Sequence, residues 1–194
     1  METFKHIKPT KAYEKKAIEY IKEFYEHNSQ INGVGGLHRF LNDYDGWLKK
    51  LEHDYSRIPT EEKVPAKTFF LVRISDNRIV GMINIRLALN KRLKKYGGHI
   101  GYSIRPTERQ KGYNKINLYL GLLYCQEHGI KKVLMDCDKE NFASAKTIQA
   151  LGGKLVNEYF DKEISTCIVQ NYIIDVDKAI VDNKDKYDFF IKRN

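Results

Sequence analysis

The segment HIGYSIRPTERQKGYNKINLYLGLLYCQEHG, residues 99–129, joins a strand pattern to a helix pattern through a proline turn. Branched and aromatic residues predict a strand that ends at Pro106. The apolar stripe of residues 115–128 predicts a helix, and Gly129 suits its C-terminal cap. The residues that follow, KKVLMDC, predict another strand. We therefore expect a strand–helix–strand crossover, which requires at least one parallel strand pair.

Helix and strand patterns flank this crossover on both sides. Before it, apolar residues at helical spacing predict one helix over residues 13–28 and a second that begins after Asn42 and Asp43. The runs KTFFLVRIS and RIVGMINIRLAL then predict a β-hairpin with its turn at Asp76 and Asn77. After the crossover we expect a short helix over residues 142–151, strands near 154–160 and 165–175, and a helical or frayed tail over 177–194.

The order of these elements predicts a mixed α/β fold in a single domain, residues 1–194. The uninterrupted apolar run Val133, Leu134 and Met135 is typical of a strand that is covered on both faces, as in parallel pairing. The glycines of INGVGGLHRF follow a helix rather than a strand, so they do not match a dinucleotide-binding loop.

Composition narrows the class of protein. Hydrophobic residues make up 42% and charged residues 30%, which is typical of a globular protein. No apolar stretch approaches the roughly 20 residues of a membrane span, and the N-terminus lacks a signal-peptide pattern, so we expect a cytoplasmic protein with no membrane partner. The three cysteines form no CxxC motif, so we expect neither a metal site nor a disulfide framework.

The net charge of +9 favours an anionic partner, and both nucleic acid and a phosphorylated cofactor would satisfy it. The excess cations are scattered along the chain rather than set along one helix, so we expect no nucleic-acid partner. Residues 109–115 offer a more specific anion site, since a strand end followed by a helix start leaves backbone N–H groups unpaired. Gly112 would let the main chain approach the anion closely. The alternative is a solvated basic helix start in which the glycine only relieves a turn.

Residues 100–153 resemble the coenzyme A core of the GNAT superfamily of N-acetyltransferases. The family's loop motif is matched by Arg109 and Gly112, although Asn114 stands where a small residue is usual. A second signature, an Asn that opens a short helix ending in Leu-Gly, is matched by Asn141 and by Leu151 with Gly152. The segments VGMINIRLALN and GGHIGYSIRP also resemble a poorly characterised bacterial branch of predicted acetyltransferases.

The resemblance implies a mostly antiparallel central sheet with flanking helices and one parallel strand pair at the cofactor cleft. It also implies an acceptor-side helical region over residues 1–60, a sheet and cofactor core over 68–175 and a C-terminal tail over 176–194. Main-chain amides of Lys111, Gly112, Tyr113, Asn114 and Lys115 would bind the diphosphate of acetyl-CoA. The strand at Ile104 would pair with its pantetheine arm, and Asn141 and Ser144 would lie close to it. The implied cofactor-binding set is Ile104, Arg109, Gln110, Lys111, Gly112, Tyr113, Asn114, Lys115, Asn141 and Ser144.

The chemistry implied by the resemblance needs a proton for the leaving thiolate. Family members commonly supply it from a Tyr seven positions after the Asn, and that position is Ile148 here. Tyr102, Tyr113 or a water molecule would have to replace it, or the thiolate leaves without a proton donor. For the base, some members carry a Glu at the position of Gly98, next to which His99 is a titratable candidate.

Acceptor binding has weaker candidates. Asn84 and Arg86 alternate with apolar residues on one strand face, and an Arg suits a carboxylate or phosphate. His38 lies in a loop that we expect to overhang the acceptor site. His99, Asn84, Arg86 and His38 also fit ordinary structural roles. The expected acceptor is the amine of a small molecule or peptide, and a homodimer could form through the last strand or the tail. The alternative function is an acyl-CoA binding or sensing module with little catalysis.

Overall fold

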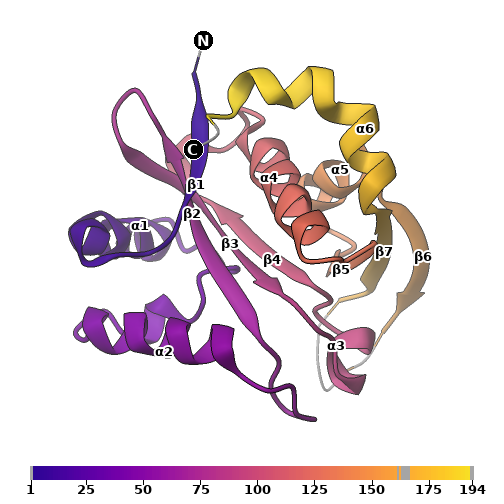
Figure 1. The fold of residues 1–194 in the computed structure, drawn as a ribbon, viewed down its shortest axis with the longest axis horizontal. Coiled ribbons are helices and arrows are strands. Elements are labelled where there is room, and N and C mark those ends of the chain that lie inside the picture. The colour runs from indigo at the N-terminus through magenta and orange to yellow at the C-terminus, as the bar shows by residue number, and fades with distance from the viewer. Residues whose placement is uncertain (1, 161, 163–166, 193–194) are drawn as a thin grey trace.

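Two antiparallel β-sheets form the framework of the chain (Figure 1). The computed structural model describes residues 2–160, 162 and 167–192. The first sheet contains, in spatial order, β1 (Phe4–Ile7), β2 (Ala66–Arg73), β3 (Arg78–Arg86) and β4 (Ile100–Ile104). The second contains β5 (Lys132–Asp138), β7 (Val169–Asp175) and β6 (Lys154–Tyr159).

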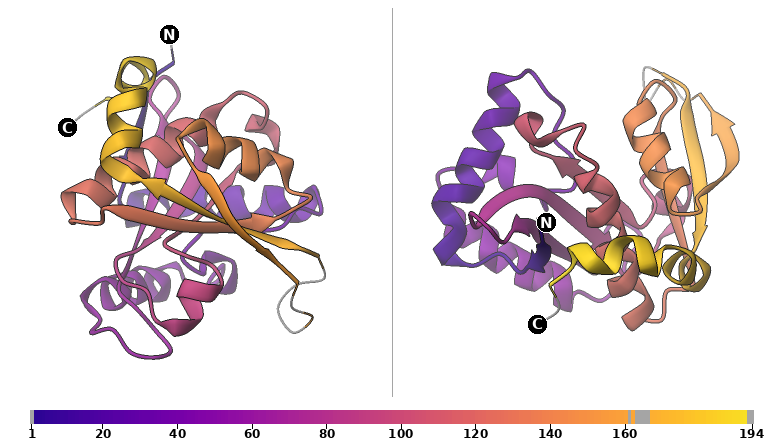
Figure 2. Two further views of the ribbon diagram at one scale, coloured as in Figure 1. Left: turned by 90° about the vertical axis from the view of Figure 1, so that its right-hand side faces the viewer. Right: turned by 90° about the horizontal axis from the view of Figure 1, so that it is seen from above.

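Helices cover both faces of the first sheet (Figures 1 and 2). One face carries α1 (Glu14–Glu26) and α2 (Tyr44–Ser56), and the other carries α4 (Tyr113–Glu127). The remaining helices are α3 (Lys91–Lys95), α5 (Phe142–Ala150) and α6 (Val176–Tyr187). The predicted mixed α/β fold with flanking helices is confirmed. No helix in the described part of the chain has the length and apolar character to span a membrane.

A hydrophobic core lies on each face of the first sheet. The hairpin β2–β3 supplies side chains to both cores, because successive residues of a strand point to opposite faces. Phe70 and Met82 pair across the strands and pack with α1 and α2, while Phe69 and Ile83 pair one position further and pack with α4. Both faces of the sheet are therefore buried, which explains the continuous apolar run FFLV in the hairpin.

The expected parallel pair is not formed: every ladder between the described strands is antiparallel. The strands that should form it, β4 and β5, touch only where they begin. There the N–H of His99 donates to the carbonyl of Leu134 at 2.7 Å, and Gly98 allows the close approach because a Cβ would lie 2.1 Å from that oxygen. Beyond this contact the two strands belong to separate sheets.

The apolar run of β5 was expected to reflect parallel pairing with both faces covered, and this explanation was also wrong. β5 pairs with β7 in antiparallel register, with Met135 opposite Tyr172. Val133 and Met135 face the core, whereas Leu134 between them is half-buried. An apolar run alone does not distinguish a strand with two buried faces from a strand at the edge of a sheet.

Most of the other predicted elements are confirmed, with small shifts at their ends. Asp43 caps α2 by accepting from the N–H of Gly46 at 2.9 Å, as expected from its position. The last strand begins at Val169 rather than near residue 165, and residues 165 and 166 lie outside the described part of the chain. The pattern did not predict the short elements β1 and α3. β1 has four residues, and α3 has five in a basic stretch that looked like a loop.

The segment between α1 and α2 lies directly on β4. The hydroxyl of Ser103 donates to the carbonyl of Asn32 at 2.5 Å. Next to it, Gly33 has a φ of +68°, and a Cβ there would lie 2.4 Å from the carbonyl oxygen of Gly101. Only a glycine permits this contact, so the segment that follows α1 depends on it for its position.

Replacing Gly33 with alanine is therefore expected to destabilise the protein by about 3 kcal/mol, because the new methyl group adds a backbone clash to the left-handed strain. The control is Gly129→Ala, which has a φ of +73° but no heavy atom within 4 Å of the added Cβ. It should cost only about 1 kcal/mol. Urea denaturation of both variants measures the difference, and equal losses would contradict the close packing at Gly33.

Candidate functional site

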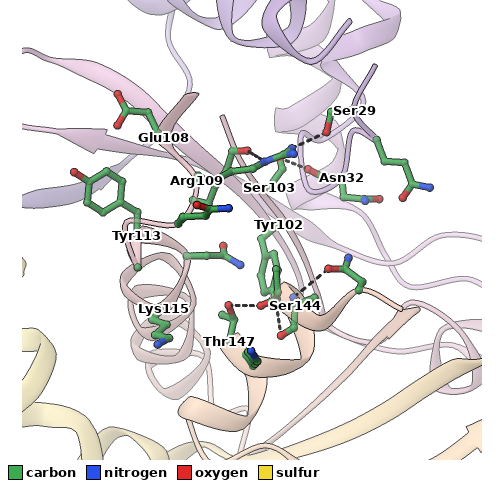
Figure 3. Close-up of a pocket in the computed structure, with 18 of the residues that line it drawn as sticks. Ser29, Asn32, Tyr102, Ser103, Glu108, Arg109, Tyr113, Lys115, Ser144 and Thr147 are labelled. Carbon is green, nitrogen blue, oxygen red and sulfur yellow. Dashed lines mark hydrogen bonds between the residues drawn. The ribbon is translucent and has the colours of Figure 1, made fainter. Parts of the chain in front are cut away.

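A cleft of about 690 Å³ opens where β4 ends and where α4 and α5 begin (Figure 3). Four segments contribute side chains to it: residues 28–32, 102–104, 108–115 and 141–147. Within the described residues, no cluster of three or more His, Cys, Asp or Glu side chains is arranged as metal ligands would be.

Unpaired backbone donors line one end of this cleft. The N–H of Lys115 donates to the carbonyl of Gly112 at 3.1 Å, and the N–H of Arg109 donates to Pro106. Between them, five N–H groups donate to no acceptor in the described part of the chain. They belong to Gln110, Lys111, Gly112, Tyr113 and Asn114, and all of these residues except Lys111 line the cleft. Together with the dipole of α4, they form a site that favours an anion.

Two left-handed residues shape this loop. Gln110 has a φ of +62°, which is uncommon for a residue with a side chain, and Gly112 has a φ of +80°. A Cβ at Gly112 would meet no protein atom within 4 Å. The space beside its main chain is thus open, as the expected close approach of an anion requires.

Cations outnumber anions along the cleft. Arg109, Lys115 and Lys146 line it, and Glu108 is the one acidic residue among the described lining residues. Arg109 crosses toward the segment after α1, where it donates to the hydroxyl of Ser29 at 2.6 Å (Figure 3). The electrostatic balance of the cleft therefore favours a negatively charged ligand.

Tyr102 of β4 and Ser144 of α5 meet in the centre of the cleft (Figure 3). Their hydroxyl oxygens are 2.9 Å apart. Burial raises the pKa of Tyr102 well above its ordinary value, although the hydrogen bond with Ser144 opposes this shift. Tyr102 is therefore protonated at neutral pH and can donate a proton or a hydrogen bond. Asn141, predicted to lie near the cofactor, caps α5 by accepting from the N–H of Ser144 at 3.1 Å.

Ile148 stands seven positions after Asn141, where the resemblance leads us to expect a tyrosine. Its side chain is completely buried in the core, and a Cβ on Gly153 would lie 2.3 Å from it. The cleft side of α5 instead presents Thr147. Asn114, the unusual residue of the loop, lines the cleft, and its side-chain oxygen is buried without a hydrogen-bond partner in the described part of the chain.

His99, the predicted base, lies at the contact between β4 and β5 and is not among the residues that line the cleft. Its Nδ1 accepts from the N–H of Leu134 at 3.0 Å, so the neutral ring carries its proton on Nε2. Burial lowers the pKa of His99. To accept a proton, the imidazole would have to release the Leu134 amide, and its role as the base stays a prediction.

The three predicted acceptor-binding residues are not brought together in this cleft. Arg86 donates to the carbonyls of Gly97 and Gly98 at 2.8 and 2.9 Å, which fixes the turn before β4. Asn84 donates to the hydroxyl of Thr68 at 3.0 Å, and His38 is exposed. Their roles in acceptor binding stay predictions.

Sequence patterns missed the segment after α1 as part of the cleft. Ser29 and Asn32 line it because the chain turns back over β4 immediately after the helix. The turn begins at Asn28, which has a φ of +47°. An asparagine at the end of a helical pattern is a recognised signal for such a turn. It does not tell which strand the following residues will cover.

Glu108 is a buried carboxylate in the loop that precedes α4. Its Oε2 accepts from Arg73 at 2.9 Å and from Lys111 at 2.8 Å. Although burial opposes ionisation, these two hydrogen bonds lower the pKa of Glu108 below its ordinary value. The charged form of Glu108 therefore stabilises the folded loop.

Comparison with known proteins agrees with this geometry. Residues 15–154 match the family model described as an acetyltransferase (GNAT) domain. No curated protein matches the chain. Among solved structures, RimJ from Mycobacterium smegmatis in complex with CoA-disulfide superposes with a TM-score of 0.65 at 12% identity, covering 92% of this chain and 88% of that one.

Two further structures have the same fold. Ribosomal-protein-S5-alanine acetyltransferase from Vibrio fischeri has a TM-score of 0.60 at 16% identity and covers 90% of this chain and 93% of its own. A chimera of spermidine N-acetyltransferase SpeG from Vibrio cholerae with hSSAT has a TM-score of 0.62 at 12% identity, with coverages of 92% and 99%. At these identities the likeness shows the fold alone.

Replacing Glu108 with glutamine is expected to lower the free energy of unfolding by about 2 kcal/mol at neutral pH, because Arg73 and Lys111 lose their shared carboxylate. The folded-state pKa lies below the ordinary value of 4.5, so this stabilisation is complete above that pH and disappears as the pH falls through the lower folded value. Denaturation at several pH values, with the exposed Glu140→Gln as control, measures it. A loss that is independent of pH would contradict this assignment.

Proposed function

Because this chain belongs to the GNAT family of N-acetyltransferases, we propose that it transfers an acetyl group from acetyl-CoA directly to a primary amine. The observation that carries the proposal is the set of five unpaired main-chain N–H groups from Gln110 to Asn114. Such a set matches the several oxygens of a diphosphate, whereas a single carboxylate would use only part of it.

The other residues of the cleft also fit coenzyme A. Lys115 and Lys146 would contribute positive charge near the phosphates, and Arg109 would hold the loop against the segment after α1. The buried, unpartnered side-chain oxygen of Asn114 would accept a hydrogen bond from a ligand. Ile104 at the end of β4 would lie along the pantetheine arm, with Asn141 and Ser144 on the opposite side.

Acetyl-CoA, when bound, supplies an activated acetyl thioester. Within this cleft, Tyr102 is the candidate to give a proton or a hydrogen bond to the leaving thiolate, because its hydroxyl lies in the cleft. Burial raises its pKa, which keeps the hydroxyl protonated but makes full proton release harder than hydrogen bonding to the developing thiolate. Ser144 would orient that hydroxyl through their hydrogen bond of 2.9 Å. Tyr102 would thus act from β4 in place of the tyrosine that Ile148 replaces on α5.

The acceptor must lose a proton when its nitrogen is acylated. His99 remains a candidate for this step, with the constraint that its Nδ1 is engaged by the Leu134 amide. Transfer to an amine that enters in its neutral form would need no base at all. If His99 is the base, the rate depends on the titration of this histidine. If the amine enters in its neutral form, the rate does not depend on it.

The identity of the acceptor is left open by the comparisons. One similar structure is named as a ribosomal-protein-S5-alanine acetyltransferase and another as a spermidine N-acetyltransferase, so one fold serves both a protein and a polyamine. We propose an amine acceptor of small-molecule or peptide size for this chain. His38, Asn84 and Arg86 remain the acceptor-side candidates.

Calorimetric titration of the wild-type protein with acetyl-CoA is expected to show saturable binding. Gly112→Ala should weaken it about tenfold, because the added methyl group occupies the space beside the unpaired amides. The control Gly129→Ala places the same methyl in a left-handed position at the other end of α4 and should bind normally. The absence of wild-type binding at millimolar ligand would end the proposal.

Tyr102→Phe is expected to lower kcat about 100-fold while the affinity for acetyl-CoA changes less than twofold, because the variant loses the proton donor but keeps the ring. Release of free thiol with a panel of amines measures turnover. Tyr25→Phe, which alters a half-exposed ring on α1, serves as control. A wild-type protein that binds acetyl-CoA but turns over no amine would instead support the binding or sensing module.

A further inference from the structure

The carboxylate of Glu23 on α1 binds the segment that leads into the loop with the unpaired amides. Glu23 is almost completely buried. Its Oε1 accepts two hydrogen bonds from Thr107, one from the main-chain N–H at 2.9 Å and one from the hydroxyl at 2.8 Å. Its Oε2 lies 2.6 Å from Nε of Arg105. One side chain thus fixes two residues between the end of β4 and the start of α4.

The arginines around Glu23 connect it to a second carboxylate. Arg78 of β3 lies 3.6 Å from Glu23 and 3.7 Å from Glu108. Glu108 in turn holds Arg73 and Lys111. Three residues of the segment 105–111 therefore bind charged side chains of other elements: Arg105, Thr107 and Glu108.

The end of α1 holds the same loop at another point. The guanidinium of Arg109 lies over the ring of Phe24, 5.5 Å from its centroid, and donates to Ser29 at 2.6 Å. Phe24 is adjacent to Glu23 in the sequence and is fully buried. Arg109 also donates from Nε to the carbonyl of Ile104 at 3.2 Å, so it links the loop both to the end of α1 and to β4.

A loop with this shape needs such support. Gln110 and Gly112 have left-handed backbone conformations, and an unrestrained loop would leave these conformations readily. Donors that are fixed before the ligand arrives bind it more tightly, because no ordering cost remains at the moment of binding. The carboxylate of Glu23 is buried and carries a negative charge, so a direct contact with a diphosphate would be repulsive. Any favourable effect of Glu23 must act through the loop.

We propose that Glu23 is a positioning residue for the cofactor, which holds residues 105–112 in the conformation that aims the amides of Gln110 to Asn114 at the diphosphate. This inference rests on the proposed function. It makes α1, a helix of the acceptor side, part of the cofactor site without any contact to the cofactor.

The test compares Glu23→Gln with Glu26→Gln, which makes the same change in charge at an exposed position of the same helix. The probes are coenzyme A, which contains the diphosphate, and pantetheine, which lacks it. Calorimetry measures the first, and ligand-observed NMR measures the weaker second. We expect Glu23→Gln to bind coenzyme A about tenfold more weakly and pantetheine unchanged within twofold. Glu26→Gln should match the wild type for both probes.

An equal loss for both probes would show a general structural role and would overturn the inference, as would unchanged affinity for coenzyme A. If Glu23→Gln does not fold, Thr107→Val replaces it, because this exposed residue loses one hydrogen bond to Glu23 and keeps its size. We then expect an approximately threefold loss for coenzyme A alone. Failure of the wild-type protein to bind coenzyme A would refute the proposed function, whereas binding that Glu23 does not influence refutes only this inference.

Discussion

Backbone N–H groups in a folded protein bond to protein, water or a ligand, and five consecutive ones around the start of α4 have no protein acceptor in the described part of the chain. A helix start always leaves orphan donors, but a side-chain cap usually satisfies some of them. Here the residue before the helix is Gly112, which has no side chain to serve as a cap. The loop therefore presents its donors to the cleft, and the remaining features of the site can be understood as arrangements that keep them there.

The separation of the two sheets gives these donors a ligand-sized space to face. β4 and β5 touch at His99 and Leu134 and then continue in different sheets, so the side chains of Tyr102 and Ser144 meet across the space between them. β5 pairs with β7 along one edge, and its other edge meets the segment of β4 only at His99 and Leu134. Tyr102 of β4 lines this space, whereas the side chain of Ile148 on α5 is buried in the core.

The sequence predicted the elements whose side-chain pattern is long and regular. The apolar stripe of α4, the hairpin β2–β3 and the cap at Asp43 were all identified, because each depends on neighbours within a few residues. Free amides were expected from Lys111 to Lys115, and four of these five are free; the N–H of Lys115 instead donates to Gly112, and the free N–H of Gln110 was not predicted. β1 was missed because four residues carry too little periodicity.

What the sequence could not predict depends on contacts between distant residues. Arg86 looked suited to an anionic ligand, but the turn at Gly97 and Gly98 takes up its guanidinium. Glu23 lies within the predicted first helix, and only the fold brings it to Thr107, 84 positions away. The direction of β5 could not be predicted either, because an apolar run fits a strand in parallel or antiparallel pairing.

We expect the main-chain N–H groups of Gln110 to Asn114 to bind the diphosphate of coenzyme A. Amide ¹⁵N–¹H NMR spectra recorded during a titration with coenzyme A, and again with pantetheine, test it residue by residue. These five resonances should shift strongly with coenzyme A and hardly at all with pantetheine. Binding of coenzyme A that leaves the five resonances in place, and moves those of another surface instead, would contradict it.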